Sequence, residues 1–93
     1  MFKCMVRLYG LPQEIADQQE VQVELENGAD MEDLIAKLRK KIPALEGIVF
    51  RTGEDRLLES YKFNLNGKFY FDRMDFKLKP GDRIALLPPI SGG

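Results

Sequence analysis

Residues 30–43 read DMEDLIAKLRKKIP, and this stretch has the clearest helical periodicity in the chain. Its apolar residues recur three or four positions apart, which places them on one face of a helix. These residues are Met31, Leu34, Ile35, Leu38 and Ile42. Asp30 suits the N-cap, Glu32 and Asp33 complement the helix dipole, and Pro43 ends the segment. The stretch therefore predicts one main helix in the middle of the chain.

Four basic residues lie in the second half of this predicted helix. They are Lys37, Arg39, Lys40 and Lys41. Positive charge near the C-terminal end of a helix complements the helix dipole. We therefore interpret the cluster as a solvated helix end rather than as a binding patch.

Two stretches before the helix alternate between apolar and polar residues, as strands with one buried face do. The first covers residues 2–9 and the second residues 21–26. Their apolar positions are Phe2, Cys4, Val6 and Leu8, and then Val21, Val23 and Leu25. This alternation makes Cys4 a core residue, although a lone sulfur invites a reactive role. Residues 10–19 are expected to form a turn and a polar loop.

Three strand segments are expected after residue 60. Residues 62–65 alternate in polarity, and Asn66-Gly67 is a strong hairpin dipeptide that leads into residues 68–71. Residues 79–82 have Pro and Gly where a type II turn needs them, and Asp82 is expected to be a turn residue. The last strand is predicted at residues 83–87, with Ile84 and Leu86 on one face.

Residues 44–60 have the weakest pattern in the chain. Residues 48–50 could form a short strand and residues 51–55 a turn, but the rest has little periodic signal. We make no firm assignment for this segment.

The order of these elements predicts an α+β fold with a mixed sheet and one main helix across it. This order matches the β-grasp fold of ubiquitin-like proteins, in which the first and last strands lie side by side. We expect a β-grasp domain at residues 1–87 and a tail at residues 88–93 that leaves the sheet from its middle.

The composition favours a carrier over an enzyme. The 93 residues suit one domain, and there is no histidine, the usual general base and nitrogen ligand for metals. The net charge is −1, with both signs interspersed, so nucleic acid is not an expected partner. The chain has a single cysteine and no apolar run of the kind found in signal peptides or membrane spans. These features indicate a soluble cytoplasmic protein that does not bind a membrane.

The chain ends in Pro88-Pro89-Ile90-Ser91-Gly92-Gly93. Glycine buries no side chain and loses the most backbone entropy on ordering, so a terminal glycine pair does little for a folded core. A backbone without Cβ atoms can pass through a narrow channel and deliver the Gly93 carboxylate to a buried site. The two prolines hold the direction in which the arm leaves the last strand. A frayed terminus is the simpler interpretation of two glycines alone, but the whole ending favours function.

This ending resembles that of the ubiquitin-like sulfur carriers. The Pro80-Gly81-Asp82 turn, the Leu65-Asn66-Gly67 segment and the Asp33-Leu34 helix start resemble them as well. The similarity extends over nearly the whole chain and is greatest to the small subunits of molybdopterin synthase, the MoaD group. The Pro-Pro-x-x-Gly-Gly ending is the most specific feature, because ThiS carriers of the thiazole pathway share Gly-Gly but usually lack Pro-Pro. Additional residues at about 46–60 match longer versions of the family.

The resemblance implies chemistry that other proteins perform on Gly93. A MoeB-like adenylating enzyme, related to the ubiquitin-activating enzymes, would use ATP to adenylate the Gly93 carboxylate. A sulfur donor would then displace AMP, leaving a C-terminal thiocarboxylate (1-thioglycine) whose sulfur is ionised and nucleophilic. A MoaE-like large subunit would accept the tail and supply the catalytic residues. The chain itself would bind no cofactor and no metal, and it would not be an enzyme.

A carrier also needs a docking surface for these partners. Family similarity places Tyr9, Phe69 and Leu87 on an exposed apolar patch of the sheet, although Tyr9 and Leu87 stand where phenylalanine is common. Either aromatic residue alone could equally be an ordinary half-buried sheet residue.

Three functions remain open at this point. The first is a sulfur carrier for molybdopterin synthesis, or for a tungstopterin or thiazole pathway. The second is a protein modifier that forms an isopeptide through Gly93, because an amine can capture the same acyl-adenylate. The third is a plain β-grasp binding module whose tail has no use.

Overall fold

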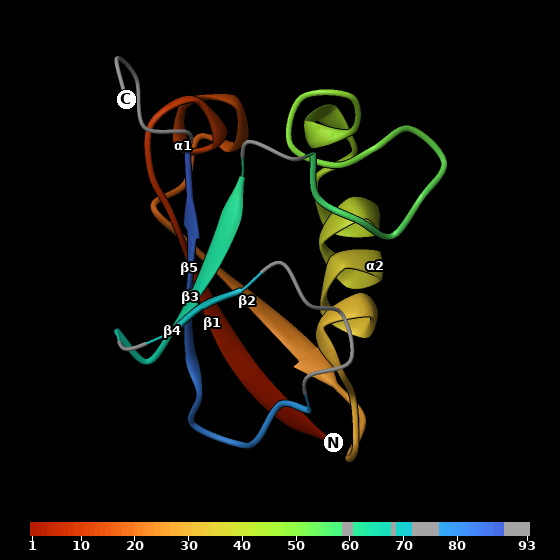
Figure 1. The fold of residues 1–93 in the computed structure, drawn as a ribbon, viewed down its shortest axis with the longest axis vertical. Coiled ribbons are helices and arrows are strands. Elements are labelled where there is room, and N and C mark those ends of the chain that lie inside the picture. Colours follow the sequence, from red (N-terminus) through yellow and green to blue (C-terminus); the bar gives the residue numbers. More distant parts are fainter. Residues whose placement is uncertain (59–60, 68, 72–76, 89–93) are drawn as a thin grey trace.

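The computed structural model describes residues 1–58, 61–67, 69–71 and 77–88, with residues 69–71 described by their backbone alone. Its elements in chain order are β1 (Phe2–Leu8), α1 (Leu11–Ala16), β2 (Glu20–Leu25), α2 (Met31–Lys41), the 3-10 helix η1 (Pro43–Leu45), β3 (Lys62–Leu65), β4 (Phe69–Phe71) and β5 (Arg83–Leu87). Figure 1 shows α2 lying across one face of the sheet. This arrangement confirms the predicted α+β class with one main helix.

The strands within the described residues form one mixed sheet in the order β2-β1-β5-β3-β4. β1 and β5 are parallel, with Val6 opposite Ile84, whereas the other neighbours are antiparallel. The first and last strands therefore lie side by side, as the β-grasp prediction requires. Because β5 is also flanked by β3, the chain leaves the sheet from an interior strand.

The core lies between the sheet and α2. The sheet contributes the apolar faces predicted from alternation, including Val6, Phe63 and Leu86, each with 0% of its surface exposed. α2 contributes Met31, Leu34, Ile35 and Leu38. Among the described residues, the buried ones are all apolar. Burial of these side chains is the main source of stability, at about 25 cal/mol for each Å² of apolar surface removed from water.

The start of α2 is held by a capping box. The Asp33 amide donates to Asp30 Oδ1 and the Asp30 amide donates to Asp33 Oδ2, both at 3.0 Å. These two bonds satisfy donors that would otherwise have no partner in the helix. The predicted N-cap is thus confirmed, and the helix ends at Lys41, just before Pro43.

Two tight turns also match their predictions. Asn66 and Gly67 both have positive φ, 54° and 74°, as a type I′ hairpin turn requires. In the Lys79–Asp82 turn, Gly81 has φ 87° and the Asp82 amide donates to the Lys79 carbonyl at 3.1 Å. The Asp82 carboxylate accepts from the Lys79 amide at 2.8 Å, which confirms that Asp82 is a turn residue.

The prediction of a loop at residues 10–19 was wrong, because residues 11–16 form α1. This helix is six residues long, with proline in its first turn, where the missing N–H breaks no helical hydrogen bond. Pro12 is its only fully buried residue, so it shows too little periodicity to be recognised in the sequence. α1 packs against η1 at one end of the molecule.

The segment after η1 is part of the core, and the possible strand at residues 48–50 is wrong. Val49 and Phe50 have no exposed surface, but Phe50 makes only isolated bridges to Glu46 and Leu57. The segment packs by side-chain burial instead of by pairing with the sheet. Alternation therefore could not reveal it.

Arg39 is not part of a solvated helix end, which corrects the interpretation of the basic cluster. Its guanidinium donates to Asp55 at 2.7 Å and to Glu46, and the Gly53 amide also donates to Glu46, at 2.9 Å. The hydrogen bonds that Arg39 donates to Asp55 and then to Glu46 raise the pKa of Arg39. The Gly53 amide and then Arg39 lower the pKa of Glu46. Arg39 thus ties residues 46–55 to α2.

Candidate functional site

The predicted tail begins directly at the end of β5. Leu87, the last residue of that strand, pairs with Lys62, and the half-buried Pro88 follows it. The expectation that the tail leaves the middle of the sheet is confirmed as far as Pro88. The remaining predicted tail residues, Pro89, Ile90, Ser91, Gly92 and Gly93, lie outside the described residues.

The turn after β1 lies against the start of the tail. Gly10 has φ 62° and ψ −136°, a conformation that residues with a Cβ rarely adopt. A Cβ built on Gly10 would stand 3.6 Å from Cγ of Pro88, which is ordinary contact distance. Gly10 is therefore needed for its backbone conformation, and its turn supports one side of Pro88. A turn was predicted here, but the sequence has no signal for its contact with Pro88.

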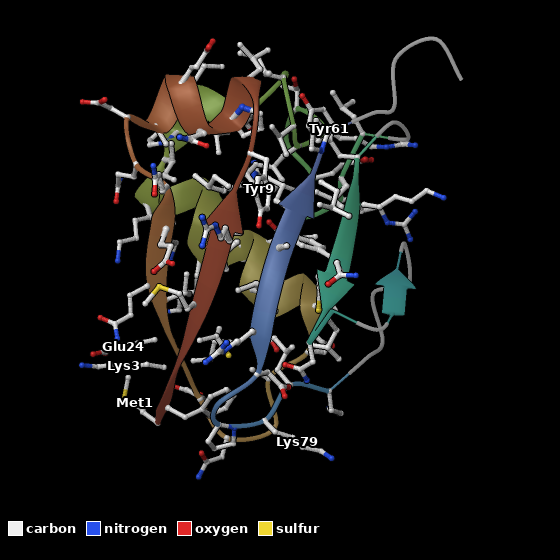
Figure 2. The ribbon with its side chains drawn as sticks, turned by 90° about the vertical axis from the view of Figure 1, so that its left-hand side faces the viewer. Met1, Lys3, Tyr9, Glu24, Tyr61 and Lys79 are labelled. Atoms are coloured by element: carbon white, nitrogen blue, oxygen red, sulfur yellow. The ribbon has the colours of Figure 1, made fainter. Side chains whose placement is uncertain are left out.

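The face of the sheet opposite α2 is the outer face, and Figure 2 views it with α2 behind the strands. Tyr9 has 39% of its surface exposed, and Leu87 is half-buried. In the parallel register of β1 and β5, Leu8 lies opposite Leu86. Tyr9 and Leu87 are the next residues, so they lie at the same end of these two neighbouring strands. Phe69 lies opposite Leu65 in the β3–β4 register, but its side chain is outside the described residues. The structure thus brings two of the three predicted docking residues together beside Pro88.

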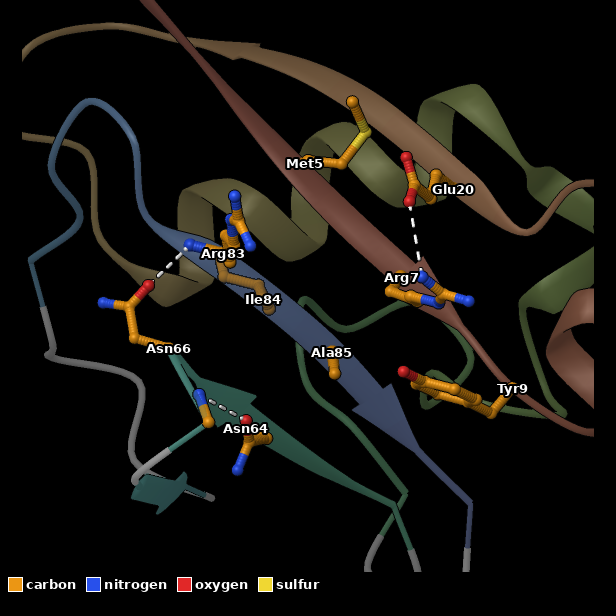
Figure 3. A pocket seen from close by; sticks show the side chains of 10 residues that line it. Met5, Arg7, Tyr9, Glu20, Asn64, Asn66, Arg83, Ile84 and Ala85 are labelled. Carbon is orange, nitrogen blue, oxygen red and sulfur yellow. Dashed lines mark hydrogen bonds and ion pairs between the residues drawn. The ribbon is translucent and has the colours of Figure 1, made fainter.

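A shallow hollow runs over the outer face between β1, β5 and β3, as Figure 3 shows. Its lining includes Met5, Arg7, Tyr9, Asn64, Arg83 and Ala85. Apolar side chains thus alternate with two arginines across the middle of the sheet. Sequence reasoning missed both arginines, although strand alternation places Arg7 on the same face as Tyr9.

Arg7 is engaged within the domain. Its Nη1 lies 3.6 Å from Glu20 Oε1, and its Cζ lies 5.5 Å from the centroid of the Tyr9 ring. The ion pair is about half exposed on both sides, so it contributes on the order of 0–1 kcal/mol to stability. The contact with the ring is within the range of a cation–π interaction. Together these contacts orient Tyr9 at the tail end of the outer face.

Cys4 faces the core, as predicted. It is 1% exposed, and its Sγ lies 4.0 Å from the Lys79 carbonyl oxygen. Burial, and then the charge of Asp82, raise the pKa of its thiol, so the reactive thiolate is disfavoured. No group of three or more potential metal ligands occurs among the described residues. Within the same residues, no helix combines the length and apolarity needed to cross a membrane.

Comparison with known proteins then decides the family. The sequence profile of the ThiS family matches residues 6–93, which includes the whole predicted tail. The chain belongs to the ThiS family. This membership confirms the predicted resemblance to the ubiquitin-like sulfur carriers.

The proteins that this ThiS-family chain resembles include a sulfur carrier subunit and a small modifier protein. A molybdopterin synthase sulfur carrier subunit from Chlamydomonas reinhardtii is 33% identical over 88 residues, covering 95% of both chains. The crystal structure of SAMP1 from Haloferax volcanii, a small archaeal modifier protein, superposes with a TM-score of 0.84 and 28% identity, covering 98% of this chain and 99% of that one. A putative molybdopterin converting factor subunit 1 from Pyrococcus furiosus has a TM-score of 0.77 and 26% identity, covering 97% and 100%. The fold is therefore shared by carriers and modifiers.

Proposed function

We propose that this protein is the sulfur carrier subunit of a molybdopterin synthase. The observation that carries the proposal is the placement of the tail. Pro88 follows an interior strand directly, and the outer face beside it is not covered by α2. The 33% identity to the Chlamydomonas reinhardtii carrier subunit over 95% of the chain supports the molybdopterin pathway.

The proposed chemistry takes place at Gly93. An adenylating enzyme joins the Gly93 carboxylate to the α-phosphate of ATP, which releases pyrophosphate and makes the acyl carbon electrophilic. A hydrosulfide-level donor then attacks that carbon and AMP leaves, which gives the thiocarboxylate. The product is ionised near neutral pH and nucleophilic, so the tail carries a reagent and not a catalyst.

The tail residues have separate roles in this proposal. Gly92 and Gly93 let the backbone enter a narrow active-site channel, because they have no side chain. Pro88 and Pro89 limit the conformations of the free arm and so reduce the entropy lost when a partner binds it. Ile90 and Ser91 span the distance between the prolines and the glycines. The large subunit supplies the catalytic residues and binds the pterin precursor.

Docking of both partners is assigned to the outer face. Tyr9 and Leu87 lie beside the start of the tail, and Phe69 is on the second strand across from β5. An apolar surface next to the tail lets a partner hold the domain while the tail enters its active site. We assign the three residues to docking on this basis.

The test is intact-mass spectrometry of the full chain. It is incubated with ATP, sodium sulfide and the adenylating enzyme of its own organism, and then with the synthase large subunit and the pterin precursor. We expect a mass gain matching replacement of one oxygen by sulfur, which is lost again when synthase and precursor are added. Failure to gain sulfur would refute the carrier function, and a gain without discharge would refute the molybdopterin pathway.

A second function, protein modification, is favoured by the likeness to SAMP1 of Haloferax volcanii. In that case an amine of a target lysine would capture the Gly93 acyl-adenylate. Conjugates of increased mass in cell extract, absent when Gly93 is deleted, would identify it. Extracts without conjugates would leave the carrier as the only use of the tail.

A further inference from the structure

The charged residues of the outer face have an uneven distribution. Outward positions of β1, β5 and β3 include four cations and, among the described residues, no carboxylate. These cations are Lys3, Arg7, Lys62 and Arg83. The acidic residues that the structure describes on this face are on the edge strand β2, at Glu20 and Glu24. The centre of the outer face is therefore positively charged, although the chain has a net charge of −1.

Two of the four cations face a carboxylate within the domain. Arg7 lies opposite Glu20 in the β1–β2 register and forms an ion pair with it, and Lys3 lies opposite Glu24. Opposite charges at such positions stabilise a strand pair. These two residues are explained by the fold itself.

Arg83 has no such explanation. It lies opposite Met5 on β1, and its backbone amide, not its guanidinium, donates to Asn66 Oδ1 at 2.8 Å. The side chain is exposed and forms no ion pair with any described residue. Figure 3 shows it over β5, with Met5 on one side and Asn66 on the other. Its planar fork of N–H donors suits a carboxylate.

Arg83 also lies within reach of any protein that holds the tail. It begins β5 and Leu87 ends that strand, so their Cα atoms are about 13 Å apart at about 3.3 Å per residue. A protein interface of standard size covers roughly 800 Å² on each partner, which corresponds to a radius of about 16 Å. A partner centred on the start of the tail therefore covers Arg83.

We propose that Arg83 binds a carboxylate on the surface of the synthase large subunit, the protein that accepts the tail. This inference rests on the proposed function, because it assumes that such a protein docks on the outer face. The partner surface has apolar side chains against Tyr9 and Leu87, and an Asp or Glu opposite Arg83. The apolar contacts supply most of the affinity, whereas the arginine selects partners and speeds association.

The test compares Arg83→Glu and Arg83→Gln with Lys37→Glu. Lys37→Glu changes the net charge as Arg83→Glu does, but on α2, on the other side of the sheet. Thermal denaturation first establishes that the three variants are folded. Calorimetric titration then measures binding of each full chain to the adenylating enzyme and to the synthase large subunit of the same organism, at low and high NaCl.

We expect Arg83→Glu to weaken binding to the synthase large subunit by tenfold or more, about 1.4 kcal/mol. Arg83→Gln should have a smaller effect, Lys37→Glu should bind like the wild type, and added salt should reduce the difference between wild type and Arg83→Glu. Equal binding of Arg83→Glu and Lys37→Glu to the large subunit overturns the inference, whatever the adenylating enzyme does.

Further measurements separate the alternatives. If wild type gains sulfur at Gly93 but Arg83→Glu binds normally, the carrier function stands and the inference fails. If wild type neither gains sulfur nor binds either protein, the proposed function fails and the inference falls with it. If Arg83→Glu loses only its binding to a single-stranded oligonucleotide, the ligand of Arg83 is a phosphate. If Arg83→Glu loses only its self-association, the ligand of Arg83 is a carboxylate of a second copy of the chain. Each of these two results also overturns the inference.

Discussion

Gly10→Ala tests how the fold holds the start of the tail. Gly10 has φ 62° and ψ −136°, and a Cβ there would meet Pro88 Cγ at 3.6 Å, without a clash. The loss of stability therefore comes from backbone strain and not from crowding. Strain of this kind costs about 1–3 kcal/mol. For a domain of this size, each kcal/mol lowers the melting temperature by about 4–8 °C.

The assay is urea denaturation of wild type, Gly10→Ala and Gly28→Ala. Gly28 also has positive φ, 86°, but a Cβ there would have nothing within 4 Å, so it reports strain at a turn that does not contact Pro88. We expect both variants to be destabilised with an unchanged m-value. Only Gly10→Ala should also slow sulfur loading of Gly93, measured where all three proteins are folded. A Gly10→Ala protein as stable as wild type would refute the argument from backbone conformation. Equal loading rates for both variants would refute the support of Pro88 by this turn.

Further predictions concern the core, the tail and the segment after η1. Phe50→Ala should destabilise the domain by about 3–5 kcal/mol in urea denaturation, because the ring has no exposed surface; a loss below about 1 kcal/mol would mean that the segment is only a surface loop. Glu46→Gln should destabilise the domain near neutral pH, and the difference from wild type should disappear as the pH falls through the lowered folded-state pKa of Glu46. The folded-state pKa of Glu46 is lowered from 4.5. Its contribution to stability is therefore fully present above the pKa of the unfolded state and is lost as the pH falls through the pKa of the folded state. A difference that persists in acid would contradict this assignment. A residue added after Gly93 should abolish sulfur loading without changing the melting temperature, and loading of such a chain would refute the mechanism. Leu87→Asp should weaken partner binding in calorimetric titration, because docking would desolvate the new charge; unchanged affinity would remove Leu87 from the docking surface.

Regular patterns allowed most elements to be predicted. Alternation at residues 2–9 and 21–26 reflects one buried face for each strand, and the strands formed at Phe2–Leu8 and Glu20–Leu25. The capping residue Asp30 and the Asn66-Gly67 turn depend on local chemistry, which a sequence displays directly. Cys4 was placed in the core by the same alternation.

Segments without a repeating pattern of apolar residues could not be predicted from the sequence. α1 is six residues long and buries one residue fully, so it has no repeating apolar face. Val49 and Phe50 are buried without belonging to a strand or helix. Arg39 was read as a solvated residue because its partners, Glu46 and Asp55, approach it only after the chain turns back at η1.

The sequence alone determined the class of the fold, the turns and the ending with its two prolines and two glycines, because each depends on residues that are close along the chain. It also carried the resemblance that the family comparison confirmed. Only the tertiary structure placed Tyr9 and Leu87 at the same end of the neighbouring strands β1 and β5, placed Gly10 against Pro88, and left Arg83 without an ion pair to any described residue. These relations join segments more than 70 residues apart. They arise because β1 and β5 pair in parallel in the middle of the sheet, and no local pattern encodes that pairing.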